Sequence, residues 1–359
     1  MGVAIINLFK RDMFSAITLT DEINDRDELP DQISSLVTFE EKSLITTTAS
    51  VVKKGHSLSL VPFTPRGAPG KEYVDDKREA VQFESRQIRQ DFTITADEIQ
   101  DVLLFGSMAE RLESLQDKVR ERMDDLLDDE RTTMEYHKLG TLMGEIREAD
   151  GVTVAEDLFQ KFGVERPADI NFDLPAKTPG ALRGKCTEVI REMRAGAQAK
   201  VDTVHSLCGK DFMDDLYRHP DVIEGYKFSR ENDRLRDRAA FVPLDFGGIQ
   251  FEEYTGYATG EDGDGPTPVD FIDPDNAHFF PLAVSGSNTG NGINPVNRLF
   301  QLRWAPAPFF SRINAPGIPH YVRVTFDPSS DPSWVKYEVS SYPIFFCRKP
   351  RALIRGKRE

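Results

Sequence analysis

Leu44-Ile45-Thr46-Thr47-Thr48-Ala49-Ser50-Val51-Val52 is the stretch that decides the fold, because its many β-branched residues predict a strand. Lys53-Lys54-Gly55 follows with the composition of a turn. Residues 57–61, Ser-Leu-Ser-Leu-Val, then alternate polar and apolar side chains, as a half-buried strand does. The sequence therefore predicts an antiparallel β-structure that begins at residue 44.

The whole segment 44–95 is predicted to form a long arm that projects from the protein. Its tip, Pro65-Arg66-Gly67-Ala68-Pro69-Gly70, holds two prolines and two glycines and excludes a regular element. The chain returns through residues 80–84 and reaches 92–95. Since ordinary monomers cover or blunt exposed strand edges, we expect the arm to lie on a neighbouring copy of an assembling protein. The expected contact residues are Lys53, Lys54, Arg66, Gly67, Gly70, Arg86 and Arg89.

A second long element is predicted between residues 107 and 139, where neither proline nor glycine occurs. Apolar residues recur there at spacings of three and four, which places them on one face of a helix about 50 Å long. They are Met108, Leu112, Leu115, Val119, Met123, Leu126 and Met134. A coiled coil is the competing interpretation, but the heptad register is not kept past Leu126. We favour a spine helix packed on a sheet.

The remaining segments complete an α+β architecture, with helices in the middle of the chain and strands at both ends. A hairpin is expected between residues 152–154 and 171–174, around a short helix at 155–162. Further helices are expected at 178–199 and 201–217. From residue 241 onward proline, glycine and aromatic residues increase, and short strands are expected. These strands are 248–251, 277–282, 299–304, 321–326, 334–339 and 344–346.

Length and charge limit the possible functions. With 359 residues and 24 Phe, the chain can bury a large core divided among two or three domains. The net charge of −15 argues against nucleic-acid binding over most of the surface, because phosphates require clustered lysine and arginine. Residues 346–359 nevertheless carry six basic residues against Glu359 alone. Either a solvated tail or a contact with an acidic partner segment would explain this cluster.

Cysteine usage predicts a reducing compartment. The chain has three cysteines, Cys186, Cys208 and Cys347, and no two of them have CxxC spacing. Because the number is odd and no such pair occurs, no disulfide framework is expected. The first residues have neither the charged region nor the cleavage site of a signal peptide, and no apolar run is long enough to span a bilayer. We expect a protein that makes no membrane contact and is cytoplasmic where it is made.

The sequence predicts no catalytic residue, no cofactor and no metal site. His205 and Cys208 lie in a stretch that is expected to be an amphipathic helix, and no second pair completes a tetrahedral metal set. The acidic turn at 260–265 lacks the calcium-loop pattern, and the glycine-rich segment 286–292 lacks the Lys-Ser/Thr ending of a P-loop.

Four stretches and the order of the elements resemble a known family. The stretches are 204–212 with His219-Pro220, 246–254, 271–281 and 336–354. Together with the acidic N-terminal arm, the β-arm and the spine helix, they resemble the tailed-phage major capsid proteins of the lambda type, the major capsid protein E family. The resemblance covers nearly the whole chain, and its stretches match as folding and packing signatures.

This resemblance implies a Hong Kong 97-type phage capsid fold with five segments. They are an N-terminal arm (1–43), an extended β-loop (44–95), a peripheral domain with the spine helix (96–177), an axial domain (178–326) and C-terminal strands that return to the peripheral domain (327–359).

The implied function is that of a major capsid protein, which assembles into the icosahedral shell around the double-stranded DNA of a tailed bacteriophage. The implied partners are copies of itself in pentamers and hexamers, a scaffolding protein, a portal, a decoration protein and DNA bound without sequence-specific contact. The implied locations are the virion and, during assembly, the host cytoplasm. A nanocompartment shell with the same fold and a cytoplasmic oligomeric enzyme remain as alternatives.

Overall fold

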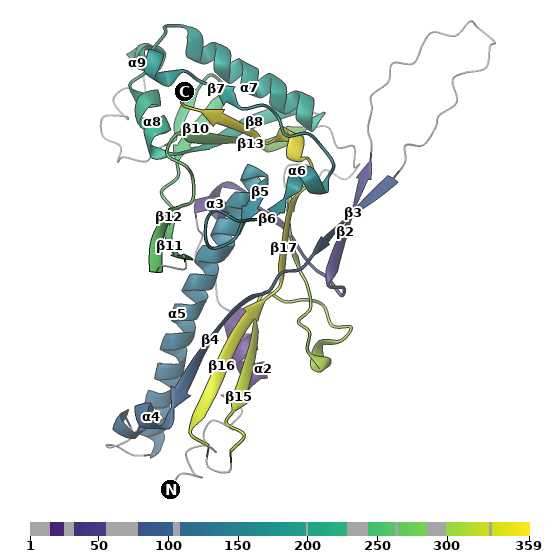
Figure 1. Cartoon of the computed structure of the whole chain (residues 1–359), viewed down its shortest axis with the longest axis vertical. Coiled ribbons are helices and arrows are strands. Elements are labelled where there is room, and N and C mark those ends of the chain that lie inside the picture. The colour runs from purple at the N-terminus through teal and green to yellow at the C-terminus, as the bar shows by residue number, and fades with distance from the viewer. Residues whose placement is uncertain are drawn as a thin grey trace, which may run out of the picture.

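The computed structural model describes residues 15–24, 32–54, 78–102, 108–198, 200–227, 243–262, 265–285, 299–329 and 332–359. In Figure 1 the upper part of the molecule is a sheet with helices beside it, and the lower part is elongated along one long helix. Helices dominate the middle of the chain and strands its two ends, which confirms the α+β class.

The upper part is built on a six-stranded mixed sheet. Across the sheet its strands are β7 (Ile170–Asn171), β18 (Ile354–Lys357), β13 (Asn276–Ser285), β8 (Lys200–Cys208), β10 (Ile249–Glu253) and β9 (Leu244–Phe246). The helices beside it are α7 (Ala181–Ala197), α8 (Lys210–Tyr217) and α9 (Pro220–Lys227). Val189 and Met193 of α7 and Phe212 of α8 are buried in one core with Phe251 and Phe279 of the sheet.

The lower part is built on α5 (Met108–Met143), a helix of 36 residues and about 54 Å. It packs on a three-stranded sheet in the order β15 (Tyr321–Phe326), β16 (Trp334–Ser341) and β4 (Ile88–Thr95). Leu115, Val119 and Met123 of the helix are buried with Ile94 and Tyr337 of the sheet. This packing confirms the prediction of a spine helix that lies on a sheet.

The spine helix continues for one turn beyond residue 139, its predicted end. At Gly140 a Cβ atom would lie 2.8 Å from the carbonyl oxygen of Glu145, so glycine lets the following strand approach the helix closely. Gly144, with a φ of +85°, then reverses the chain. The strand β5 (Glu145–Arg147) follows and pairs with β6 (Val154–Asp157).

The arm begins as the antiparallel pair β2 (Thr48–Lys54) and β3 (Arg78–Glu84), which confirms the predicted β-structure but not its bounds. The strand starts at Thr48 instead of residue 44, and Lys53 and Lys54, predicted as a turn, belong to it. Residues 92–95, predicted as part of the arm, lie in β4, which pairs with β16 of the lower sheet.

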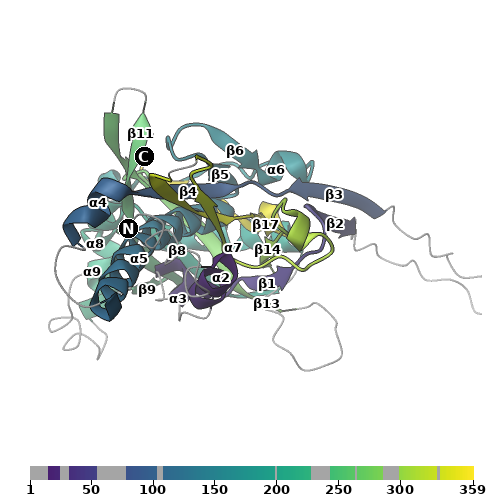
Figure 2. The ribbon, with the colours of Figure 1, turned by 90° about the horizontal axis from the view of Figure 1, so that it is seen from below.

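Both views show β2 and β3 on the side of the molecule opposite α4 (Ala96–Val102) and α5 (Figures 1 and 2). The root of the arm is fixed, because the buried Phe83 ring stacks on Phe346 with centroids 5.1 Å apart. The predicted strand at 57–61 and the tip at 65–70 lie outside the described residues.

A third sheet lies beside the arm root. Its strands are β1 (Glu40–Ser43), β14 (Phe300–Trp304) and β17 (Pro343–Cys347), with β14 in the centre. The six strands expected after residue 241 are confirmed as β10, β13, β14, β15, β16 and β17. The other elements are α2 (Ala16–Asn24), α3 (Gln32–Leu36), α6 (Leu158–Lys161), the hairpin β11 (Tyr257–Asp262) and β12 (Gly265–Asp270), and the 3-10 helices η2 (Leu174–Ala176), η4 (Phe310–Arg312) and η5 (Pro350–Ala352).

The helix predicted at 201–217 is wrong in its first half. The structure has the strand β8 there, and α8 starts only after Gly209. β8 pairs with β13 on one side and β10 on the other, and the residues from Val204 to Cys208 are all buried. Val201, Val204 and Cys208 recur at spacings of three and four, which is typical of a helix face, but the strand also buries the polar His205 and Ser206 between them.

The predicted hairpin between residues 152–154 and 171–174 is also wrong. β6 pairs with β5 instead, and β7 pairs with β18 in parallel. Pairing of β6 with β5 is favoured because Asp150 closes a tight turn between them. Its carboxylate accepts hydrogen bonds from Val152 N (2.9 Å) and Thr153 N (2.8 Å).

Strand pairing connects the predicted axial segment 178–326 with the C-terminal segment 327–359. β14 and β15 pair with β17 and β16, while β18 pairs with β13 in the six-stranded sheet. The boundaries themselves stay predictions, and each of the two segments contributes strands to the sheets of the other.

Two glycines of α7 give a matched test of its packing. A Cβ atom at Gly196 would lie 2.0 Å from the carbonyl oxygen of Arg351, whereas one at Gly184 would meet nothing within 4 Å. Gly196→Ala should lower the free energy of unfolding by about 1–3 kcal/mol, because backbone must move. Gly184→Ala should raise it by about 0.5–1 kcal/mol, because alanine favours the helix. Urea unfolding measures both, and equal effects would contradict this close approach of α7 to η5.

Candidate assembly surfaces

The first candidate surface is the base of the arm, where Arg86 follows β3. Its guanidinium donates hydrogen bonds to Glu148 Oε1 (2.6 Å) and to the carbonyl oxygen of Ala155 (2.5 Å). Both acceptors belong to the segment of the β5–β6 hairpin. Arg86 therefore fastens the end of the arm to that hairpin.

A second arginine ties the start of β4 to the lower sheet. Arg89 lies 2.7 Å from the carboxylate of Glu338 on β16. The Glu338 side chain is only 7% exposed, whereas that of Arg89 is 45% exposed. The arginine therefore supplies a counter-charge in direct contact with a buried carboxylate.

Of the predicted contact residues, Arg86 and Arg89 thus have partners within the chain. Lys53 and Lys54 lie at the outer end of β2, where they pair in register with Glu79 and Arg78. Arg66, Gly67 and Gly70 lie outside the described residues. A role of these seven residues in contacts between copies stays a prediction.

The edge strands of the arm and of the lower sheet have different neighbours. Within the described residues β2 and β3 pair only with each other, so each leaves one edge without a strand partner. The edge strand β15 is instead covered by α2, whose Leu19 and Ile23 are buried. Thr20 Oγ1 accepts a hydrogen bond from Val322 N (3.1 Å), and the Asn24 side chain bonds both backbone groups of His320. Strand edges without a partner are the kind of surface on which strand addition can occur.

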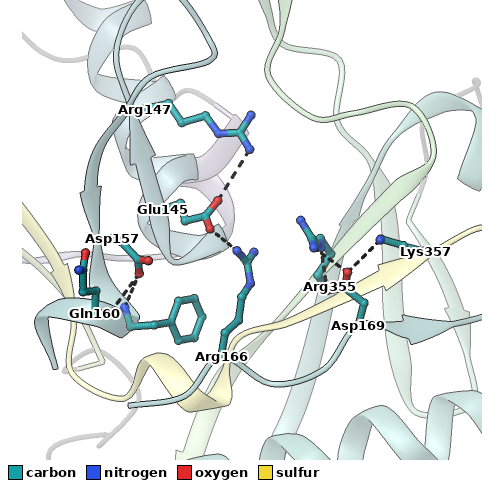
Figure 3. A network of polar contacts seen from close by, with 9 residues as sticks. Glu145, Arg147, Asp157, Gln160, Arg166, Asp169, Arg355 and Lys357 are labelled. Atoms are coloured by element: carbon teal, nitrogen blue, oxygen red, sulfur yellow. Dashed lines mark hydrogen bonds and ion pairs between the residues drawn. The ribbon is translucent and has the colours of Figure 1, made fainter. Parts of the chain in front are cut away.

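A polar network joins the upper and lower parts of the molecule (Figure 3). Glu145, just beyond α5, forms an ion pair with Arg166 and lies 3.7 Å from Arg147. Asp169 accepts two hydrogen bonds from Arg355 of β18, at 2.8 and 2.6 Å. Glu145 thus binds Arg166, and Asp169 binds Arg355, where the upper and lower parts of the molecule meet.

His278 of β13 is buried near the same network and makes the junction sensitive to acid. Burial, together with the nearby cations Arg166 and Arg355, lowers the pKa of His278 from 6.5 to about 3. The folded protein therefore holds this imidazole in its neutral form at the pH of a cell.

The C-terminal basic cluster finds acidic partners within the chain. Arg355 and Lys357 both pair with Asp169, and Arg358 pairs with Asp215 and Asp275. A solvated tail is therefore wrong for these three residues, because they pair with carboxylates of the same chain, and contact with a separate acidic partner stays a prediction.

His205 and Cys208, which were considered as catalytic or metal-binding residues, contact other buried side chains of the protein. His205 Nε2 lies 3.2 Å from the Glu252 carboxylate, which also accepts a hydrogen bond from Gln32 (2.8 Å). Cys208 is buried beside Ser206, and burial raises the pKa of its thiol to about 12. Among the described residues, no cluster of three or more His, Cys, Asp or Glu could hold a metal ion. No helix in the same ranges has the length and apolar character needed to cross a bilayer.

Sequence reasoning missed the partners that fix the arm. Glu338 and Glu148 are ordinary acidic residues far from Arg89 and Arg86 in the chain, so no local spacing predicts these pairs. It also missed the two exposed apolar residues Phe310 and Ile313 in the loop 305–320. The signal that was present is the pair Phe309-Phe310 within a proline-rich loop.

Comparisons with known proteins agree with one another. A profile of the family described as phage major capsid protein E matches residues 15–358. A major capsid protein of Pseudomonas phage KPP10 is 27% identical over 316 residues, which cover 84% of each chain. A prophage protein of E. coli CFT073, assigned as a capsid protein, has a similar structure with a TM-score of 0.53 at 13% identity. That match covers 98% of this chain and 96% of the other, and it shows a shared fold.

The Arg89–Glu338 pair should be a strong stabilising contact. Arg89→Ala removes the guanidinium that contacts the buried Glu338 carboxylate and should lower the free energy of unfolding by about 2–4 kcal/mol. Arg131→Ala is the matched control, because it removes an exposed ion pair with Asp128, for which we expect a loss of about 0–1 kcal/mol. Chemical unfolding measures both losses. Equal losses would mean that Arg89 does not neutralise a buried charge.

His278 should make the folded protein less stable in mild acid. Below pH 6.5 the unfolded chain binds a proton at His278, whereas the folded chain does not until the pH approaches 3, so stability falls as the pH falls between these values. Unfolding of His278→Asn should depend less on pH between 6 and 5, by about one proton, or roughly 1.4 kcal/mol per pH unit. An unchanged slope would show that His278 is protonated in the folded state.

Proposed function

The chain belongs to the phage major capsid protein E family, and on that premise we propose that its β-arm binds neighbouring copies in a closed icosahedral shell. It is a major capsid protein of a phage, with the Hong Kong 97-type fold. The nanocompartment alternative is not favoured, since the family and the curated relative are both phage capsid proteins.

The observation that carries the proposal is the contrast between the root and the edges of the arm. Phe83, Ala49 and Val51 bury the root in the main core, so the direction of the arm is fixed before assembly. The described parts of β2 and β3 each leave one edge without a strand partner. Main-chain hydrogen bonds to these edges, together with apolar contact, would join one copy to the next by strand addition.

In this proposal the seven predicted contact residues divide into two roles. Arg86 and Arg89 hold the base of the arm through Glu148 and Glu338. Lys53, Lys54 and Arg66 would supply positive charge for contacts with neighbouring copies, each of which has a net charge of −15, and Gly67 and Gly70 would be further contact residues. Copies would be grouped in pentamers and hexamers, and the five predicted segments would serve as the units that adjust between the two.

The proposed partners beyond copies of the chain follow from the capsid role. A scaffolding protein would guide closure, a portal would occupy one vertex, and a decoration protein would bind the outer surface. Double-stranded DNA would fill the lumen without sequence-specific contact, because the acidic chain repels phosphate over most of its surface. Assembly would take place in the host cytoplasm, and the product is part of the virion.

We further propose that the protein catalyses no reaction, because the family is structural. Cys186, Cys208 and Cys347 are buried, and burial raises the pKa of each thiol to about 12, which removes the thiolate that a nucleophile needs.

The test shortens the arm without disturbing its root. Because Lys54 pairs in register with Arg78, residues 55–77 can be replaced by Asn-Gly, a two-residue hairpin turn. The full chain, produced with its neighbouring genes, should give uniform shells in electron microscopy, and the shortened chain should give only small oligomers.

The matched control changes a different hairpin turn. Replacing Gly263-Asp264, between β11 and β12, by Asn-Gly should leave shell formation intact. Thermal unfolding checks that both variants fold. Normal shells from the folded short-arm variant would contradict the role of the arm, and small oligomers from the full chain would contradict the shell.

A further inference from the structure

The loop 305–320, between β14 and β15, displays apolar side chains on a rigid support. Phe310 is 96% exposed and Ile313 is 65% exposed, and both lie at the tip in or next to η4. Single exposed apolar residues are common on protein surfaces, but two at one tip, with an almost fully exposed Phe, form a local apolar surface. We call Phe310 and Ile313 the apolar tip.

The support of the tip is fixed by contacts within the chain. The loop contains Pro306, Pro308, Pro316 and Pro319, which restrict its backbone. Gly317 N donates a hydrogen bond to the carbonyl oxygen of Leu44 (2.8 Å). A Cβ atom at Gly317 would lie 2.2 Å from the carbonyl oxygen of Trp304, so this anchor requires glycine.

Aromatic and cation–π contacts attach the loop to β15. The Phe309 ring packs edge-on against Tyr321, with centroids 6.3 Å apart. The guanidinium of Arg312 lies over the Tyr321 ring at 5.6 Å, and that of Arg323 lies over Phe309 at 6.0 Å. Phe309 thus serves the fold, whereas its neighbour Phe310 is directed away from it.

We propose that the apolar tip is a second contact between copies of this chain, separate from the β-arm. This inference rests on the proposed shell function. The anchor at Leu44 places the loop beside the arm root, and Figure 1 shows the loop (yellow-green) on the same side of the molecule as β2 and β3. An arm that crosses onto a neighbouring copy therefore brings the tip beside that copy.

Charge also favours a second copy as the occupant. The loop contains Arg312 and no acidic residue, whereas a neighbouring copy carries a net charge of −15. DNA is a poor match, because one arginine beside two apolar side chains does not form the basic cluster that phosphates require. The turn after Leu44 adds a further apolar side chain, Ile45, which is 61% exposed.

The first experiment compares two aspartate substitutions at the tip. Phe310→Asp removes the apolar side chain and should reduce the fraction of chain found in closed shells at least tenfold, measured by sedimentation and electron microscopy. Ser311→Asp adds the same charge at the exposed neighbouring position and should reduce it less than twofold. Phe310→Leu should restore most of the assembly. Normal shells from Phe310→Asp would overturn the inference while leaving the shell function intact.

A second measurement identifies the occupant directly and does not depend on the stability of a variant in solution. A photo-crosslinking phenylalanine analogue at position 310, in assembled particles, should yield covalent dimers of this chain. Crosslinks to DNA or to a different protein, or none at all, would overturn the inference. Absence of shells from the unaltered chain with its neighbouring genes would overturn the shell function together with this contact.

Discussion

A hairpin can transmit binding to the rest of a protein only if its root is held, and here the stack of Phe83 on Phe346 holds it. Phe83 comes from β3 and Phe346 from β17, so the stack joins the arm to the C-terminal strands. Phe162, which follows α6, packs on the same Phe83 ring with centroids 5.7 Å apart. Arg86 and Arg89 add charged contacts immediately beyond this point. The main core therefore fixes the direction of the arm, and a force on the arm is transmitted to that core.

The same molecule covers some strand edges and leaves others open, and this difference organises its surface. β15 is protected by α2, which supplies hydrogen-bond partners from Thr20 and Asn24 as well as the buried Leu19 and Ile23. The described strands of the arm pair only with each other. The hairpins β5–β6 and β11–β12 also pair only within themselves among the described residues, so an open edge alone does not distinguish the arm. What distinguishes the arm is the burial of its root in the main core. The rigid loop 305–320 provides a contact of a different kind, made by side chains at a fixed tip.

Much of this architecture could be predicted from local patterns. The apolar stripe of α5 is a periodic signal and the β-branched residues of the arm are a compositional one, and the structure confirms a helix and a strand pair there. β8 could not be assigned in the same way, because its residues from Val204 to Cys208 are buried on both faces of the sheet, so polar and apolar residues do not alternate. The Arg89–Glu338 pair and the cover of β15 by α2 depend on residues far apart in sequence, which no local spacing relates. The exposure of Phe310 is likewise set by the tertiary anchors of its loop.

The burial of the three thiols has a consequence for the particle after it leaves the host. A virion outside a cell is surrounded by oxygen, without the glutathione that keeps thiols reduced inside cells. Oxidation and disulfide exchange both begin from an accessible thiolate, and Cys186, Cys208 and Cys347 offer none near neutral pH. The shell should therefore keep the same covalent structure over long storage in air, without random cross-links between or within its subunits.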